Sequence, residues 1–197
     1  NPHPSFRKGR DHALFFAVSD YKNPKFDRLK NPVTNARAIA SVLSSKYGFD
    51  TTVVVNPTFR TIATKIEEFR DKFARNVDGR YPENGQLIIY FSGHGMLADF
   101  NGYFIPSDGD PYSPITSAFA YKVWRPVISA INCKHILVAI DACYSSSFSP
   151  KYGTQADPVF KRPGEYTEEQ KIIINHDDNK TRIFFTSDAE EKETPDL

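Results

Sequence analysis

The feature that most constrains the fold is the alternation of short apolar runs with longer amphipathic segments. The apolar runs at 12–19, 51–56, 86–91, 135–140 and 181–187 are predicted as strands, and 102–106 as a short extended piece. The run QLIIYF at 86–91 is continuously apolar, as expected for a strand covered on both faces. Strands that alternate with helices predict an α/β sandwich, in which a largely parallel central sheet is flanked by helices.

The segment 31–49 is predicted as the first helix. Asn31 is a suitable N-cap, Pro32 suits the first helical position, and Gly48 ends the segment. The spacing of its apolar residues predicts one buried face, formed by Ala36, Ile39, Ala40 and Leu43.

Two further helices are predicted. The segment 58–76 has the apolar stripe Ile62, Ile66, Phe69 and Phe73. A shorter helix is predicted around 124–131, with Pro126 near its start. The chain is long enough for one domain with a real core, and it contains no internal repeat.

Charge and composition exclude several classes of partner. A net charge of +1 provides no strong field for nucleic acid or an anionic membrane, so neither is predicted as a partner. No apolar run is long enough to span a bilayer, and the first residues do not form a signal peptide. The chain begins with Asn1 rather than Met, which suggests a processed or trimmed piece of a longer protein.

The two cysteines, Cys133 and Cys143, flank a predicted strand. At about 3.3 Å per residue they lie roughly 30 Å apart. A disulfide needs Cα atoms within about 7 Å, so the pair cannot be bridged. Free thiols favour a reducing compartment, and a cytoplasmic location is predicted. Cys133 precedes the strand and is interpreted as a packing residue.

His94 and Cys143 follow two buried strands at the same offset. Each lies three residues beyond the last apolar residue of its strand, Phe91 and Ile140. Ligands of open α/β sheets bind beyond the carboxyl ends of the strands. If the two strands are neighbours, about 4.8 Å apart, the imidazole could take the proton of the thiol. The backbone N–H groups of Gly95 and Cys143 could then hold an oxyanion.

These residue types also have other interpretations. A lone cysteine after a strand is most often a small buried hydrophobe, and a lone histidine in a turn is usually polar surface. His12 and His135 begin their strands and so lie at the opposite edge of the sheet, while His3 and His176 fall in a tail and a linker. No spacing of cysteine and histidine resembles a zinc site, and SGHG is not a phosphate loop.

The motifs YFSGHG and IDACYS together resemble the caspase-like cysteine proteases (peptidase family C14), especially metacaspases and their bacterial relatives. His94 and Cys143 are 49 residues apart, which is similar to the family's spacing of about 50 residues. The resemblance extends to ALFFAVSDY, LKNPVTNARAIASVL, GYFIPSDGD and TRIFFTS. It implies a three-layer caspase-like sandwich, with His94 as general base and acid and Cys143 as nucleophile.

The resemblance also implies a substrate pocket lined by Ser92 and Asp141. A carboxylate on its floor would pair with arginine or lysine and repel an acidic side chain. Alternatively, Asp141 is only a turn residue that caps a strand end. Leu29 stands where caspases that cut after aspartate carry arginine, so aspartate specificity is not expected.

The sequence departs from the metacaspase pattern in several places. Asn35 replaces an aspartate that helps to form the pocket in metacaspases, and Ser146 replaces the glycine after the cysteine motif. Asp108 and Asp110 only partly resemble the family's calcium sites, so no cofactor is predicted and calcium is left open. The chain also stops before the last helix and strand of the family's small subunit.

These features divide the chain into four expected parts. Residues 1–10 form an N-terminal tail, 11–144 the large-subunit core, 145–180 a polar inter-subunit linker, and 181–197 the incomplete start of the small subunit. The linker is expected to be cut after a basic residue. Arg162 precedes Pro163 and is a poor site, so Lys151 and Lys171 are the cleavage candidates.

The sequence therefore predicts a cysteine endopeptidase that cuts after arginine or lysine and is activated by processing or by a partner. The predicted partners are a protein or peptide substrate and a small-subunit fragment or activating protein. A catalytically silent scaffold or adaptor is the alternative, although the presence of both His94 and Cys143 argues against it. A thiol-dependent hydrolase of non-peptide substrates is a third possibility.

Overall fold

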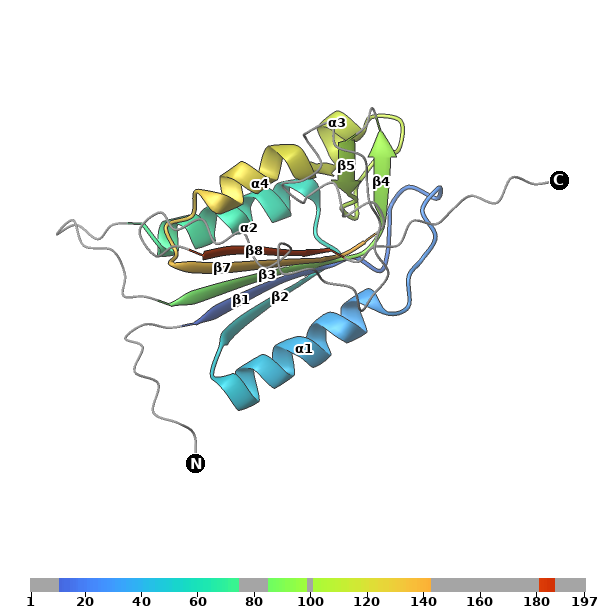
Figure 1. The fold of residues 1–197 in the computed structure, drawn as a ribbon. Helices are drawn as coiled ribbons and strands as arrows, with labels where there is room; N and C mark the ends of the chain where they lie inside the picture. The colour runs from blue at the N-terminus through green and yellow to red at the C-terminus, as the bar shows by residue number, and fades with distance from the viewer. Residues whose placement is uncertain (1–10, 75–84, 99–100, 143–180, 187–197) are drawn as a thin grey trace, which may run out of the picture.

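The computed structural model describes residues 11–74, 85–98, 101–142 and 181–186, and a sheet of five parallel strands forms its centre (Figure 1). The spatial order is β2–β1–β3–β7–β8, and every neighbouring pair is parallel. The strands are β1 (His12–Ala17), β2 (Asp50–Val55), β3 (Gln86–Ser92), β7 (His135–Asp141) and β8 (Thr181–Thr186). The predicted parallel sheet is thus confirmed.

Helix α1 (Pro32–Tyr47) covers one face of this sheet (Figure 1). Ala36 and Ala40 are buried against Phe15 and its neighbours on β1. Gly48 ends the helix in the left-handed conformation (φ 73°), and its N–H donates to the carbonyl oxygen of Ser44. Glycine adopts this conformation without a side-chain clash, so the predicted stop signal is confirmed.

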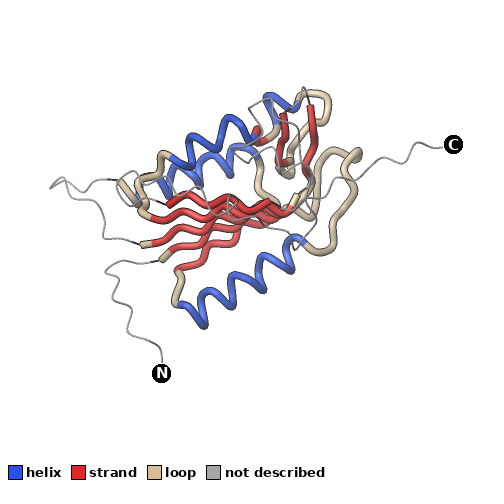
Figure 2. The backbone as a smooth tube through the Cα atoms, viewed as in Figure 1, coloured by secondary structure: helices blue, strands red, loops and turns tan. Residues whose placement is uncertain are grey.

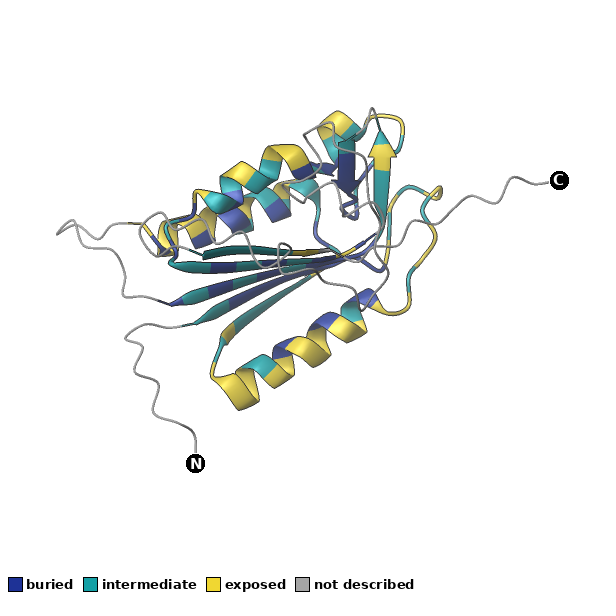
Figure 3. Ribbon diagram, in the orientation of Figure 1, coloured by how far each residue is buried: buried dark blue, intermediate teal, exposed yellow. Residues whose placement is uncertain are grey.

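Asn31 is the N-cap of α1 and Pro32 its first residue, as predicted, but two details of the helix differ from expectation. The Asn31 side chain makes no capping hydrogen bond, because its backbone is already helical rather than extended (φ −94°, ψ −31°). Ile39 is 40% exposed rather than buried. The buried residues Pro32, Ala36 and Ala40 follow one another every four positions, so α1 meets the sheet along a narrow stripe. Figure 3 shows that the outer side of the helix is exposed.

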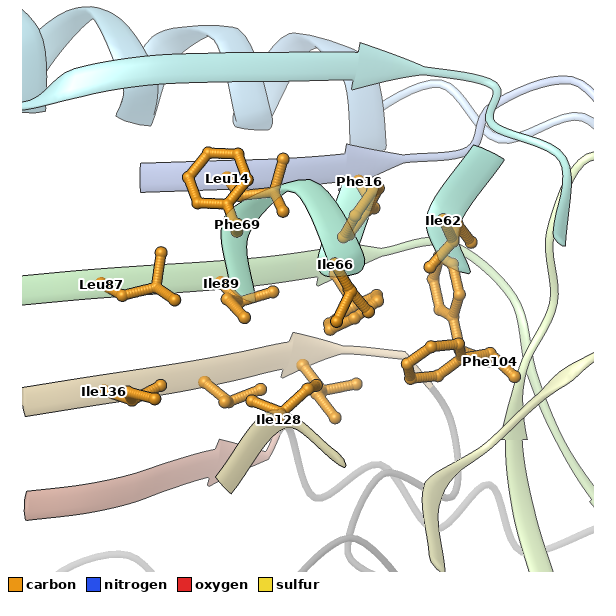
Figure 4. Packing of buried hydrophobic residues seen from close by; sticks show 14 of the residues in the cluster. Leu14, Phe16, Ile62, Ile66, Phe69, Leu87, Ile89, Phe104, Ile128 and Ile136 are labelled. Atoms are coloured by element: carbon orange, nitrogen blue, oxygen red, sulfur yellow. The ribbon is translucent and has the colours of Figure 1, made fainter. Parts of the chain in front are cut away.

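Helices α2 (Phe59–Lys72) and α4 (Tyr121–Ser129) cover the other face of the sheet. Figure 4 shows Ile62, Ile66 and Phe69 of α2 packed over β1, β3 and β7. The predicted stripe of α2 is confirmed, since all four of its members are buried. The N-cap of α2 is Thr58, whose hydroxyl oxygen accepts the N–H of Thr61 at 3.2 Å.

Helix α4 begins at Tyr121, before the predicted start, and Pro126 lies inside it rather than near its start. Proline was expected early because a missing N–H costs nothing in the first turn. Packing decides the actual position: Tyr121 is fully buried and Trp124 packs against the same core, which holds the first turn on the sheet.

A small antiparallel sheet lies beyond the carboxyl end of β3 (Figure 2). It contains β4 (Gly95–Ala98), β5 (Asn101–Phe104) and β6 (Phe119–Ala120), and the short helix α3 (Pro114–Ser117) adjoins β6. Only β5 overlaps a predicted extended piece, the one at 102–106. Among the described helices, none combines the length and the apolar character needed to cross a membrane.

Candidate active site

The carboxyl ends of β3 and β7 lie side by side. The two strands are parallel neighbours, with Phe91 opposite Ile140 and Ser92 opposite Asp141. His94 and Cys143 follow Ser92 and Asp141 by two residues each. The adjacency that the dyad requires is therefore confirmed. Cys143 lies outside the described residues, so its distance from His94 stays a prediction.

Gly93 forms the exit from β3, in a crowded position. Its N–H donates to the carbonyl oxygen of Asp141 at 3.3 Å. A Cβ at this position would lie 2.8 Å from Tyr21 Oη and 3.2 Å from Phe104 Cε2. Only glycine allows such close approach of the backbone to these side chains. The glycine before the histidine thus allows the backbone to pack closely against the Tyr21 side chain.

The imidazole of His94 is half-buried, and groups from the segment between β1 and α1 hold it in place. Its Nε2 lies 2.9 Å from the carbonyl oxygen of Asp27, and its ring contacts those of Tyr21 and Phe26, with centroids 4.9 and 5.8 Å away. A carbonyl oxygen can only accept, so Nε2 carries the hydrogen. In the neutral ring, Nδ1 is then the nitrogen that can take a proton.

The backbone on either side of the ring is also fixed. The His94 carbonyl oxygen accepts the N–H of Ile105 at 2.9 Å, and the His94 N–H donates to Tyr21 Oη at 2.7 Å. The peptide bond from His94 to Gly95 is trans, so the N–H of Gly95 points away from β5. This direction suits a donor that serves a ligand rather than the small sheet.

Asp141 ends β7 as an exposed residue, and two hydroxyls of β3 bind it. Its Oδ2 accepts from Tyr90 Oη at 3.2 Å and from Ser92 Oγ at 3.3 Å. Ser92 is only 2% exposed. The pKa of Tyr90 is raised, chiefly by burial and further by the Asp141 carboxylate. These contacts fit either a pocket floor or a capped strand end.

Of the other predicted pocket positions, the structure places Asn35 on the exposed side of the first turns of α1 and Leu29 half-buried just before that helix. The Leu29 N–H donates to the carbonyl oxygen of Ser19 at 2.9 Å. The roles assigned to Ser92, Asp141 and Asn35 in substrate binding stay predictions. The cleavage candidates Lys151 and Lys171, together with Ser146, lie outside the described residues.

Each of the two acids considered for calcium accepts a backbone N–H group. Asp108 accepts the N–H of Phe59 at the start of α2 at 2.8 Å, and Asp110 accepts the N–H of Tyr112 at 3.0 Å. The described part of the chain holds no group of three or more side chains suited to a metal ion. Dependence on calcium stays untested.

His12, His135 and Cys133 lie where the sequence placed them. His12 is opposite Leu87 and His135 opposite Gln86, at the amino ends of the strands. Cys133 is 1% exposed, and its Sγ lies 3.3 Å from the carbonyl oxygens of Gly85 and His135. Burial raises the pKa of Cys133 to about 11, as expected for a packing residue.

Sequence reasoning missed Tyr21, Phe26, Asp27 and Tyr90. The first three come from a connecting segment whose path no periodicity reveals. Tyr90 had a usable signal, because it precedes Ser92 by two residues and so shares its face of β3.

The fold agrees with the comparisons to known proteins. The family model described as "Caspase domain" matches residues 10–194, so the chain belongs to the caspase domain family of cysteine peptidases. Pro-sf-caspase-1 is 17% identical with a TM-score of 0.53, and the match covers 91% of this chain and 60% of that one. Caspase-1 from Spodoptera frugiperda is 19% identical with a TM-score of 0.50, covering 70% and 48%.

At these identities the solved structures show the fold, which is the mixed α/β caspase sandwich with its mostly parallel central sheet. This chain spans 60% of the length of the first structure and 48% of the second. No curated protein matches the sequence.

Proposed function

We propose that the protein is a cysteine endopeptidase that cuts after arginine or lysine, with His94 and Cys143 as its catalytic dyad. Membership of a family of cysteine peptidases supports the reaction class. The observation that carries the proposal is the register of β3 and β7, from which His94 and Cys143 extend by equal numbers of residues.

In this mechanism the Cys143 thiol gives its proton to Nδ1 of His94, and the thiolate attacks the scissile carbonyl carbon. The oxyanion is held by the N–H groups of Gly95 and Cys143. His94 then protonates the leaving amine, which departs and leaves an acyl-enzyme. Water, deprotonated by His94, hydrolyses the thioester and restores the thiol. The Asp27 carbonyl oxygen, as acceptor of Nε2–H, keeps the ring in the required tautomer.

The preference for a basic residue rests on Asp141. Two hydroxyl donors bind one of its oxygens, Oδ2, and fix the direction of the carboxylate. Its other oxygen can then accept from a guanidinium or ammonium group of the substrate. Asn35 in place of a second acid leaves Asp141 as the main charge in this pocket.

Peptide turnover tests the reaction. Fluorogenic peptides ending in arginine, lysine or aspartate are assayed with and without calcium, with wild type, Cys143→Ala and His94→Ala. We expect turnover after arginine and lysine, and a loss of at least about a thousandfold in kcat for either variant. Cys133→Ala is the matched control and should retain activity. Mass spectrometry of the active sample also reports cleavage after Lys151 or Lys171.

Absence of turnover with every peptide, calcium included, would favour the silent scaffold or adaptor. Activity that survives in Cys143→Ala would refute the dyad. Hydrolysis confined to non-peptide thioesters or esters would favour the third possibility, a thiol-dependent hydrolase.

The charge of Asp141 is tested with Asp141→Asn, which keeps the shape and can still accept from Tyr90 and Ser92. A hydrogen bond to a charged group contributes about 1.5–3 kcal/mol, so kcat/KM for the arginine peptide should fall roughly tenfold to a hundredfold. A peptide with a neutral residue at that position should be affected much less. Asp71→Asn, on the exposed last turn of α2, is the control. Equal losses for both peptides would identify Asp141 as a structural cap.

A further inference from the structure

The groups described above as contacting the His94 ring, namely Tyr21, Phe26 and the Asp27 carbonyl oxygen, all come from the segment between β1 and α1. Tyr21 stands out because it contacts both parts of the residue. Its hydroxyl accepts the His94 N–H at 2.7 Å, and its ring centroid lies 4.9 Å from the imidazole centroid. One side chain therefore fixes the backbone and the ring together.

We propose that Tyr21 is a positioning residue for His94, an inference that rests on the catalytic role proposed above. Its hydroxyl holds the backbone at the end of β3, so that the imidazole keeps its Nε2–H on the Asp27 carbonyl oxygen and presents Nδ1 to the thiol. The ring of Phe26 also contacts the imidazole, with 5.8 Å between the two centroids.

The hydroxyl of Tyr21 has a defined orientation. It donates to the carbonyl oxygen of Val18 at 3.3 Å, which leaves its lone pairs for the N–H of His94. Burial raises the pKa of Tyr21, so the hydroxyl stays protonated at any pH at which a cysteine peptidase is assayed. The same arrangement therefore serves through the whole catalytic cycle.

The chain needs such a support at this point. Residues exchange both backbone hydrogen bonds in a hydrogen-bonded antiparallel pair, and Ile105 gives its N–H to His94. The His94 N–H goes to Tyr21 Oη instead of returning to Ile105. Gly93, which has no side chain to anchor it, precedes this position. Loss of the hydroxyl would leave the N–H unpaired and the histidine free to shift.

The supporting segment is itself tied down. Asn56, in the left-handed region at φ 47°, accepts the N–H groups of Ser19 and Asp20 on its Oδ1 at 2.8 and 3.1 Å. Arg28 Nε lies 2.7 Å from Asp20 Oδ1, which joins the two ends of the segment. The segment that carries Tyr21 is thus held in place by its own hydrogen bonds and ion pair.

Kinetics of Tyr21→Phe provide the first test. This variant keeps the ring and removes only the hydroxyl. Small displacements of a catalytic group cost up to about a hundredfold, so we expect kcat to fall roughly tenfold to a hundredfold. KM should change less than about twofold, since no substrate contact is lost. Tyr103→Phe removes the hydroxyl of a buried tyrosine from the cluster against which Tyr21 packs, and it should leave kcat unchanged. An unchanged kcat in Tyr21→Phe, an equal loss in Tyr103→Phe, or a change confined to KM would overturn the proposal.

Nuclear magnetic resonance of the histidine rings tests positioning without activity. The full chain carrying Cys143→Ala is labelled with ¹⁵N-histidine, and the His94 signals are identified by their loss in His94→Ala. We expect one tautomer, with hydrogen on Nε2, when Tyr21 is present and a mixture in Tyr21→Phe. The same tautomer in both proteins would overturn the proposal.

The two tests also separate this inference from the proposed function. If Tyr21→Phe changes the tautomer but the wild-type protein turns over no peptide, the proposed function is refuted and the positioning role is kept. Should Tyr21→Phe fail to fold, as judged by circular dichroism, the Tyr21-containing protein still decides: a mixed tautomer there overturns the proposal, and a single Nε2–H tautomer supports it.

Discussion

At the scale of single residues, Cys133 shows how strand ends set reactivity. It lies before β7, with its Sγ 3.3 Å from the carbonyl oxygens of Gly85 and His135. Burial is the main cause that raises the pKa of the Cys133 thiol, because it disfavours the charged thiolate. The same strand ends at Asp141, two residues before the proposed nucleophile. One strand thus separates a thiol that burial keeps neutral from a thiol that we propose to be activated.

This contrast predicts a pH dependence of alkylation. The thiolate is the reactive form, and the pKa of Cys133 is raised to about 11, so its reactivity appears only as the pH rises toward that value. At pH 8 a pKa of about 11 leaves roughly one Cys133 in a thousand ionised. Iodoacetamide at pH 7 to 8, followed by mass spectrometry, should therefore modify Cys143 before Cys133.

Guanidinium-unfolded protein is the control for the alkylation experiment, because both thiols then regain ordinary pKa values and should react at similar rates. If folded Cys133 reacts at neutral pH as fast as Cys143, then Cys133 is not the buried, protonated thiol described above.

At the scale of elements, the helices on the two faces use different ways of packing. Helix α2 inserts large side chains into the core over β1, β3 and β7. Helix α1 meets the sheet through Ala36 and Ala40, so its larger apolar residues lie at the sides of the contact. Apolar spacing therefore predicted α2 correctly but overestimated the buried face of α1, since periodicity alone does not show how wide the contact is.

The difference predicts unequal costs for the same substitution. Ile66 is 1% exposed, and Ile66→Ala should lower the free energy of unfolding by about 3 kcal/mol through lost transfer energy and a cavity. Ile39→Ala, on the exposed side of α1, should change it by less than about 0.5 kcal/mol. Urea unfolding followed by circular dichroism measures both, and similar losses at the two positions would contradict this account.

At the scale of the whole molecule, the parallel sheet gathers the candidate site at one edge. The end of β3 provides His94, the end of β7 provides Asp141, and the segment after β1 provides Tyr21 and Asp27 (Figure 1). These three strands are consecutive in the sheet. Because parallel strands all end at the same edge, residues far apart in the chain meet there, and no local sequence signal shows which strands are neighbours.

The sequence by itself determined the five strands of the parallel sheet, the two long helices, and the equal offsets that drew attention to His94 and Cys143. These features are local, because a strand or helix with one buried face has apolar residues at a characteristic spacing in the sequence. Tertiary structure alone decided that β3 and β7 are neighbours, that Pro126 is inside α4, and that Tyr21, Phe26 and Asp27 surround His94. The contacts of Tyr21 and Asp27 with His94 join residues more than sixty positions apart, and only packing of the whole sheet and its connections decides which residues meet.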